Sequence, residues 1–181
     1  MKLQKLLLIA IFLGIGTIFH ALIPGIFFGM KPDMLLTMMF ISIFLFAERG
    51  NIVIVGLVAG ILSGFTTTIP GGFIPNIIDK LVTALVIFAL YCLLRRVMNH
   101  MVTAPILTAV GTAVSGTVFL TALTVLGALP AKTSFIAMFI AVVLPAVVIN
   151  TIFVAIIYPI IVKIMGQSRK SQLSSNIAKR S

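Results

Sequence analysis

Six apolar segments occupy almost the whole chain, and most are long enough to cross a lipid bilayer as a helix. They are residues 3–23, 34–47, 52–69, 77–94, 103–129 and 134–164. A membrane-spanning helix needs about 20 mainly apolar residues. Between the segments lie charged residues, glycines and prolines, which favour turns and loops. The pattern predicts an all-α integral membrane protein with six transmembrane helices.

The composition leaves room for one membrane domain only. Hydrophobic residues make up 61% of the 181 residues and charged residues 9%, whereas a soluble domain is about half apolar and about a quarter charged. A soluble fold of this length could not bury so much apolar surface, so lipid must cover the excess. We predict a single transmembrane domain over residues 1–166 and a flexible, basic cytoplasmic tail over residues 167–181.

The distribution of basic residues predicts the orientation. The chain has 13 Lys and Arg against 3 acidic residues, and cytoplasmic loops of membrane proteins carry the excess of Lys and Arg. With six spans and a cytoplasmic N-terminus, only Lys31, Lys80 and Lys132 face outward. The remaining ten basic residues then face the cytoplasm: Lys2, Lys5, Arg49, Arg95, Arg96, Lys163, Arg169, Lys170, Lys179 and Arg180. We therefore expect both termini in the cytoplasm and attribute the basic charge to topology, not to nucleic-acid binding.

Two loops on the predicted outer side suggest a pocket. The second segment is short, about 21 Å as a helix, and it follows the irregular stretch Lys31-Pro32-Asp33. A loop rich in glycine and proline, residues 70–76, precedes the fourth segment. Non-helical backbone at membrane depth is tolerated only where protein or a water-filled cavity receives it. We predict that both loops dip into the protein and border an outward-facing pocket.

Charged residues near this pocket are scarce, and ionisable groups at the membrane are commonly functional. Asp33 with Lys31, and Asp79 with Lys80, form two acid–base doublets at the outer ends of the second and fourth segments. A zwitterionic solute would find an ammonium for its carboxylate and a carboxylate for its ammonium there. The alternative is that these residues cap their helices and anchor them at the interface.

Three uncharged polar residues are further candidates for binding. Asn76 either caps the fourth helix or donates a hydrogen bond to a solute. His20, near the outer end of the first helix, either makes an interfacial hydrogen bond, couples a proton or contacts an indole ring. Asn150 lies within the sixth segment, where an unpaired amide is costly, so it bonds either another helix or the solute.

Small residues form two rows at helical spacing, which allow close helix approach. Gly56, Gly60 and Gly64 form one row on the third segment, and Ala10 and Gly14 belong to the other on the first segment. Both rows are expected to pack inside the bundle. The first-segment row has the alternative of docking on a second membrane protein.

Motifs of several enzyme classes are absent from the sequence. It has no GxxxxGK[ST] phosphate loop, no HExxH, no Cys/His cluster and no nucleophile elbow, and it contains a single cysteine. We expect no enzyme activity, no metal site and no cofactor.

Residues 29–34 (GMKPDM) and 74–80 (IPNIIDK) resemble motifs of the bacterial tryptophan transport protein family. The similarity includes residues 142–146 (VVLPA) and 150–151 (NT), and extends to residues 158–160 (YPI). The resemblance implies a protein of the bacterial cell membrane that imports tryptophan. On this reading Lys31 and Lys80 are candidates for binding the substrate carboxylate, with Asp33 and Asp79 as candidates for its ammonium.

That family is in turn similar to the substrate-binding S components of energy-coupling-factor (ECF) transporters. S components are six-helix proteins that bind one nutrient from outside. They dock on a transmembrane coupling subunit through small residues of the first helix, and two cytoplasmic ATPases drive the complex. In this chain Ala10-x-x-x-Gly14 departs from the usual Ala-x-x-x-Ala. Two other functions stay open: a solitary proton-driven transporter, in which His20, Asp33 or Asp79 titrates, and a membrane scaffold without a solute.

Overall fold

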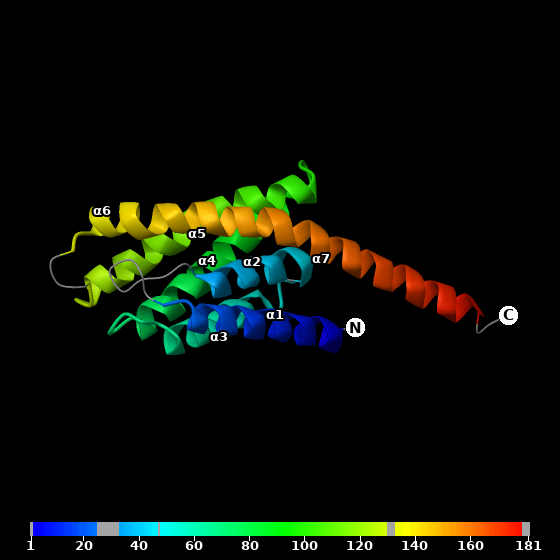
Figure 1. Cartoon of the computed structure of the whole chain (residues 1–181), viewed down its shortest axis with the longest axis horizontal. Coiled ribbons are helices and arrows are strands. Elements are labelled where there is room, and N and C mark those ends of the chain that lie inside the picture. The colour runs from blue at the N-terminus through cyan, green and yellow to red at the C-terminus, as the bar shows by residue number, and fades with distance from the viewer. Residues whose placement is uncertain (1, 25–32, 47, 130–132, 179–181) are drawn as a thin grey trace.

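The structure is a computed structural model that describes residues 2–24, 33–46, 48–129 and 133–178, with side chains described from Leu3 to Gln167. The described residues form six helical rods and no strand. The rods are α1 (Lys2–Leu22), α2 (Met34–Phe46), α3 (Ile52–Phe65), α4 (Phe73–Leu94), α5 (His100–Val125) and a last rod made of α6 (Phe135–Met138), the π-helical turn η1 (Phe139–Val143) and α7 (Leu144–Ala178). They match the six predicted segments. Figure 1 shows them packed lengthwise as a bundle, with both termini at the same end.

Four of these rods are long and apolar enough to cross a membrane: Leu3–Leu22, Phe73–Leu94, His100–Val125 and Phe135–Gln167. Large apolar side chains remain exposed along their outer faces, such as Ile18, Ile106 and Ile152. A soluble protein seldom leaves such extended apolar surface uncovered. The all-helical membrane bundle predicted from the sequence is therefore confirmed.

Helix α2 lies at the centre of this bundle. It contacts α1, α3, α4, α5 and α7, and every residue of it except Met34 and Leu45 is buried. A helix that is apolar on all sides is a buried helix. Because other helices rather than lipid surround it, α2 need not cover the full thickness of the bilayer, which accounts for the short second segment.

The glycine row of α3 packs against α4, as predicted. A Cβ atom at Gly60 would lie 2.7 Å from the Cα of Ile77, and one at Gly56 would lie 3.1 Å from the Cα of Leu81. Only glycine permits this separation between the two backbones. The close contact holds the outer end of α4, which carries Asp79 and Lys80, against the rest of the bundle.

Two helices begin earlier than predicted. Helix α4 begins at Phe73 rather than at residue 77, since Pro75 fits a first turn, where no N–H partner is needed. Helix α5 begins at His100 rather than at residue 103, because the Asn99 side chain accepts a hydrogen bond from the Met101 N–H at 3.0 Å. Helix α7 continues through Ala178, into the segment predicted as a basic tail.

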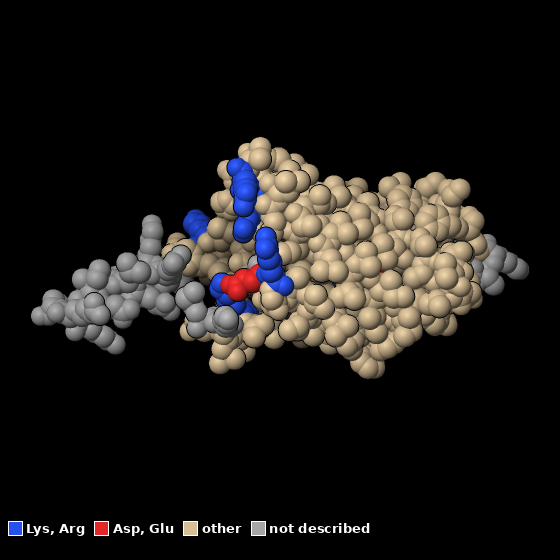
Figure 2. All heavy atoms as spheres, turned by 180° about the vertical axis from the view of Figure 1, so that it is seen from behind, with Lys and Arg blue, Asp and Glu red and all other residues tan. Residues whose placement is uncertain are grey.

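The described basic side chains on the surface gather towards the end of the molecule that carries the termini (Figure 2). Arg49, Arg95 and Arg96 are exposed in the turns at this end. Glu48, beside Arg49 in the sequence, forms an ion pair with Lys5 of α1. Lys163 of α7 is exposed as well. Lys80, in contrast, is buried, towards the opposite end of the bundle.

Candidate functional site

A pocket lies between the helices at the end opposite the termini. Its walls come from α1, α2, α4, α5, the last rod and the α3–α4 connection. It is lined by His20, Asp33, Leu36, Thr67, Thr68, Ile69, Asn76, Asp79, Lys80, Thr112, Ser115, Gly116, Phe119, Val142, Val143, Ala146 and Asn150. About 80 Å³ of it is open to the centres of water molecules, ample room for a small solute, since one water needs roughly 10–15 Å³.

The structure brings six of the seven predicted binding residues to this one pocket. They come from the three helices α1, α4 and α7 and from the residue that precedes α2: His20, Asp33, Asn76, Asp79, Lys80 and Asn150. The seventh, Lys31, lies outside the described residues, and its role stays a prediction.

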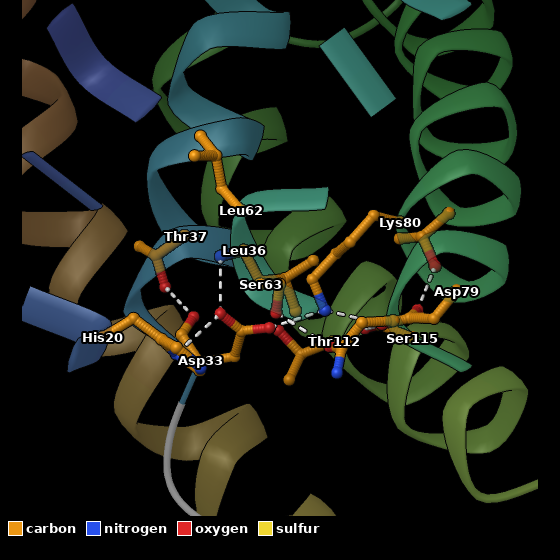
Figure 3. Close-up of polar contacts among 12 residues, drawn as sticks. His20, Asp33, Leu36, Thr37, Leu62, Ser63, Asp79, Lys80, Thr112 and Ser115 are labelled. Carbon is orange, nitrogen blue, oxygen red and sulfur yellow. Dashed lines mark hydrogen bonds and ion pairs between the residues drawn. The ribbon is translucent and has the colours of Figure 1, made fainter. Parts of the chain in front are cut away.

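A group of three charges, two of them buried and the third, Asp33, partly exposed, forms the polar side of the pocket (Figure 3). The Lys80 Nζ atom lies 2.5 Å from Asp33 Oδ2 and 2.6 Å from Asp79 Oδ2. The Asp79 and Lys80 side chains are only 1% and 2% exposed. Lys80 thus pairs with Asp33 across two helices, a contact that the two predicted doublets did not include. Two carboxylates share one ammonium, so this group carries an excess negative charge.

Asp33 combines helix capping with this ion pair. Its Oδ1 atom accepts a hydrogen bond from the Leu36 N–H at 3.0 Å, which caps α2. The same oxygen lies 3.1 Å from Nδ1 of His20 on α1. Burial alone would raise the pKa of Asp33, but the Lys80 ammonium and the His20 ring hold it well below its usual range. Asp33 is therefore a fixed negative charge at the rim of the pocket.

Asp79 is held in place by hydroxyl groups from two helices. Thr83, one turn further along α4, donates to Asp79 Oδ1 at 3.0 Å, and Ser115 of α5 donates to Asp79 Oδ2 at 2.9 Å. Each carboxylate oxygen has two lone-pair sites, so Asp79 keeps acceptor capacity for a solute ammonium.

The two pocket asparagines differ in how fully they are hydrogen-bonded. Asn76 accepts from Ser63 at 2.7 Å and donates to the Gly72 carbonyl at 2.8 Å, so its amide ties the start of α4 to α3. Asn150 donates from Nδ2 to Thr112 Oγ1 at 3.3 Å. Its Oδ1 atom is buried, with no hydrogen-bond partner among the described residues. The interhelical bond expected for Asn150 is present, and one polar atom is left over.

The opposite side of the pocket is apolar. Phe119 of α5 and Val142, Val143 and Ala146 of the last rod line it. Val143 fits closely over Gly116, where a Cβ atom would lie 2.5 Å from Val143 Cγ1. The pocket therefore joins a charged wall to an apolar wall, an arrangement suited to a solute with the same two halves.

A π-helical turn shapes that apolar wall. Val142 and Val143 belong to η1, which ends two residues before Pro145. Proline has no N–H to donate to the carbonyl four residues earlier, and its ring crowds that carbonyl. The wider π turn accommodates the mismatch, and such turns are frequent at functional sites.

The small residues of α1 face away from this pocket and from the bundle core. Ala10 and Gly14 are exposed, and a Cβ atom at Gly14 would meet nothing within 4 Å. The glycine that packs α1 against α2 is Gly16, where a Cβ atom would lie 2.9 Å from Met38 Cβ.

Comparison with known proteins identifies the family. The family model of the tryptophan transporter TrpP matches residues 2–166. The chain belongs to this family. Among its relatives is a probable tryptophan transport protein of Bacillus subtilis, 46% identical over 93% of this chain and 96% of the relative. Proteins of the same description from Clostridium acetobutylicum and Clostridium perfringens are 42% and 36% identical, over 91% and 85% of this chain and 95% and 88% of their own lengths. No solved structure matches the chain significantly.

Membership in the tryptophan transporter family makes this a transport protein and not an enzyme. It also favours transport over the scaffold function that the sequence left open. The resemblance stated from residues 29–34 and 74–80 is confirmed, and Asp33, Asp79 and Lys80 from those two motifs meet in the pocket.

Proposed function

We propose that the protein imports tryptophan and binds it as a zwitterion in the pocket described above. The observation that carries this proposal is a buried carboxylate, Asp79, and a partly exposed one, Asp33, that share one buried ammonium beside an apolar wall. A substrate ammonium placed against Asp33 and Asp79 offsets their excess negative charge. The apolar wall around Phe119 and Val143 then receives the flat indole ring, since apolar surface gains free energy when it leaves water.

Lys80 and Lys31 are the proposed partners of the substrate carboxylate. The Lys80 ammonium has three N–H donors, and the contacts with Asp33 and Asp79 occupy two of them. One donor therefore stays available for the substrate. Lys31, two residues before Asp33 in the sequence, is the second proposed partner.

We further propose that the pocket opens to the outside of a bacterial cytoplasmic membrane, with both termini in the cytoplasm. The exposed basic side chains at the terminal end support this orientation (Figure 2), because cytoplasmic loops are enriched in Lys and Arg. The substrate then enters from the outer ends of the helices.

The proposed energy source is an ECF-type complex, with a transmembrane coupling subunit and two ATPase subunits as partners. Ala10 and Gly14, exposed on the surface of α1, support an ECF-type complex. Small residues on a lipid-facing surface allow a helix of another subunit to approach closely. Proton coupling by the chain alone is the second candidate, favoured by the buried contact of His20 with Asp33. Uptake by the purified chain in vesicles, abolished by a protonophore, supports the second. Uptake that requires ATP and co-purified subunits supports the first.

Binding itself is testable without a label, because the chain contains no tryptophan residue. All indole fluorescence in a titration then comes from the ligand. We expect the emission of added tryptophan to shift to shorter wavelength and saturate with purified protein. An emission spectrum that stays that of free tryptophan at all protein concentrations contradicts the proposed function.

A further inference from the structure

The unpartnered oxygen of Asn150 calls for a ligand donor. Asn150 is fully buried and lines the pocket, and with its nitrogen donating to Thr112 its Oδ1 atom has no partner among the described side chains and backbone. A buried acceptor left without a hydrogen bond is costly. It persists where a bound molecule supplies the missing donor.

Asn150 lies at the floor of the pocket, further from the outer loops than the charged group. Its partner Thr112 precedes Ser115, the hydroxyl that binds Asp79, by three residues on α5. At 1.5 Å rise per residue, this places the Asn150 amide about 4.5 Å deeper along α5 than the Asp79 carboxylate. A ligand whose ammonium lies at Asp79 therefore reaches Asn150 with the atoms of its side chain.

The pocket residues that come from α5 and the last rod, on either side of Asn150, include no charged side chain that would pair with a second charged group of the ligand. Ala146, one turn earlier on α7, is apolar, as are Val142 and Val143 of the same rod. The described carboxylates and the ammonium of the pocket come from α4 and the residue before α2, on the opposite wall. An uncharged donor attached to an apolar ring suits this position, and the indole N–H of tryptophan is such a donor.

We propose that Asn150 Oδ1 accepts a hydrogen bond from the indole N–H and so makes the pocket select tryptophan over amino acids whose rings lack a donor. This inference rests on the proposed function, and it assigns Asn150 a role in specificity beyond helix packing. A site built to bond a substrate N–H rejects analogues without it, because its own polar atom is then left unpaired.

The test compares tryptophan with two analogues on the purified full chain in detergent or lipid discs. 1-Methyltryptophan replaces the N–H hydrogen with a methyl group and remains fluorescent. The benzothiophene analogue replaces the N–H with sulfur and adds no bulk, and its affinity is measured by displacement of tryptophan. We expect both to bind about tenfold or more weakly than tryptophan.

Two variants connect the preference to Asn150. In Asn150→Ala, the affinities for tryptophan and for the two analogues differ by no more than about twofold, because the acceptor is gone and the methyl group of 1-methyltryptophan gains room. Asn150→Leu keeps the side-chain volume without the acceptor, and it loses the preference over the benzothiophene analogue. Ser115→Ala is the matched control at the other wall: it weakens all three ligands alike, so their ratios persist.

The outcomes separate this inference from the proposed function. A wild-type protein that binds none of the three ligands overturns the proposed function. A wild-type protein that binds all three equally overturns only the role of Asn150. The role of Asn150 is also overturned if a folded Asn150→Ala or Asn150→Leu protein still prefers tryptophan over both analogues. Another group must then accept the hydrogen bond from the indole N–H.

Discussion

Replacing Lys80 with methionine tests whether the buried charges hold the bundle together. Lys80→Met keeps a long, flexible side chain and removes the only ammonium that contacts both Asp33 and Asp79 among the described residues. Removing one partner of a buried ion pair costs about 3–5 kcal/mol, because the remaining charge is left uncompensated.

The size of the loss can be estimated independently. With Lys80 gone, the least costly response of the two facing carboxylates is to take up one proton. At pH 7 this proton uptake by a carboxyl of ordinary pKa, about 3.9, costs roughly 1.4 kcal/mol for each of about three pH units, or about 4 kcal/mol. For a chain of this size that corresponds to a fall in melting temperature of about 8–16 °C.

The assay is thermal loss of helical circular dichroism in detergent, at pH 7 and pH 5. The folded variant holds one more proton than its unfolded chain, so lowering the pH favours its folded state by about 1.4 kcal/mol per unit. The gap in melting temperature between the variant and the wild type therefore narrows at pH 5. Adding Asp79→Asn to Lys80→Met removes the repulsion and recovers about half of the loss. A Lys80→Met protein that melts within about 2 °C of wild type refutes this reasoning.

Three further changes test other parts of the structure. Asp79→Asn keeps the side-chain shape and one oxygen that can accept from Thr83 or Ser115, but it removes the negative charge, so we expect a folded protein whose affinity for tryptophan, measured by ligand fluorescence, falls about tenfold or more. Gly60→Val forces α3 away from α4, so size-exclusion chromatography in detergent should show little folded protein. The control is Gly50→Ala, made where a Cβ atom meets nothing within 4 Å. A comparable loss of folded protein in the control would contradict this prediction. Gly14→Leu should leave binding unchanged and lower uptake by cells at least severalfold, because it obstructs the proposed docking face; undiminished uptake argues against that face.

The membrane fold follows from the sequence because length and hydropathy settle it. The apolar segments and their breaks predict every rod to within about four residues, except for the end of the last rod, which runs to Ala178. The exceptions have local causes that a hydropathy pattern does not show, such as Pro75 within the first turn of α4 and the capping side chain of Asn99. The π turn is a similar case: Pro145 signals a lost hydrogen bond, but the form of the distortion depends on packing.

The candidate site was only partly predictable. Charges are so rare in this chain that Asp33, Asp79 and Lys80 could be singled out, but their pairing depends on how α2 and α4 are placed beside each other. Ser115 and Thr112 were missed because α5 carries hydroxyl groups on several faces. Thr117, Thr121 and Thr124, for example, bond carbonyls of their own helix away from the pocket. Spacing alone does not distinguish the two sets.

The most direct test of the central claim, that tryptophan occupies this pocket, is to fill the pocket and measure tryptophan fluorescence. Ala146 lines the pocket, whereas Ala155 lies exposed on the same helix. We predict that Ala146→Phe abolishes the saturable emission shift while Ala155→Phe binds tryptophan as wild type does. Equal binding by both variants would contradict the account.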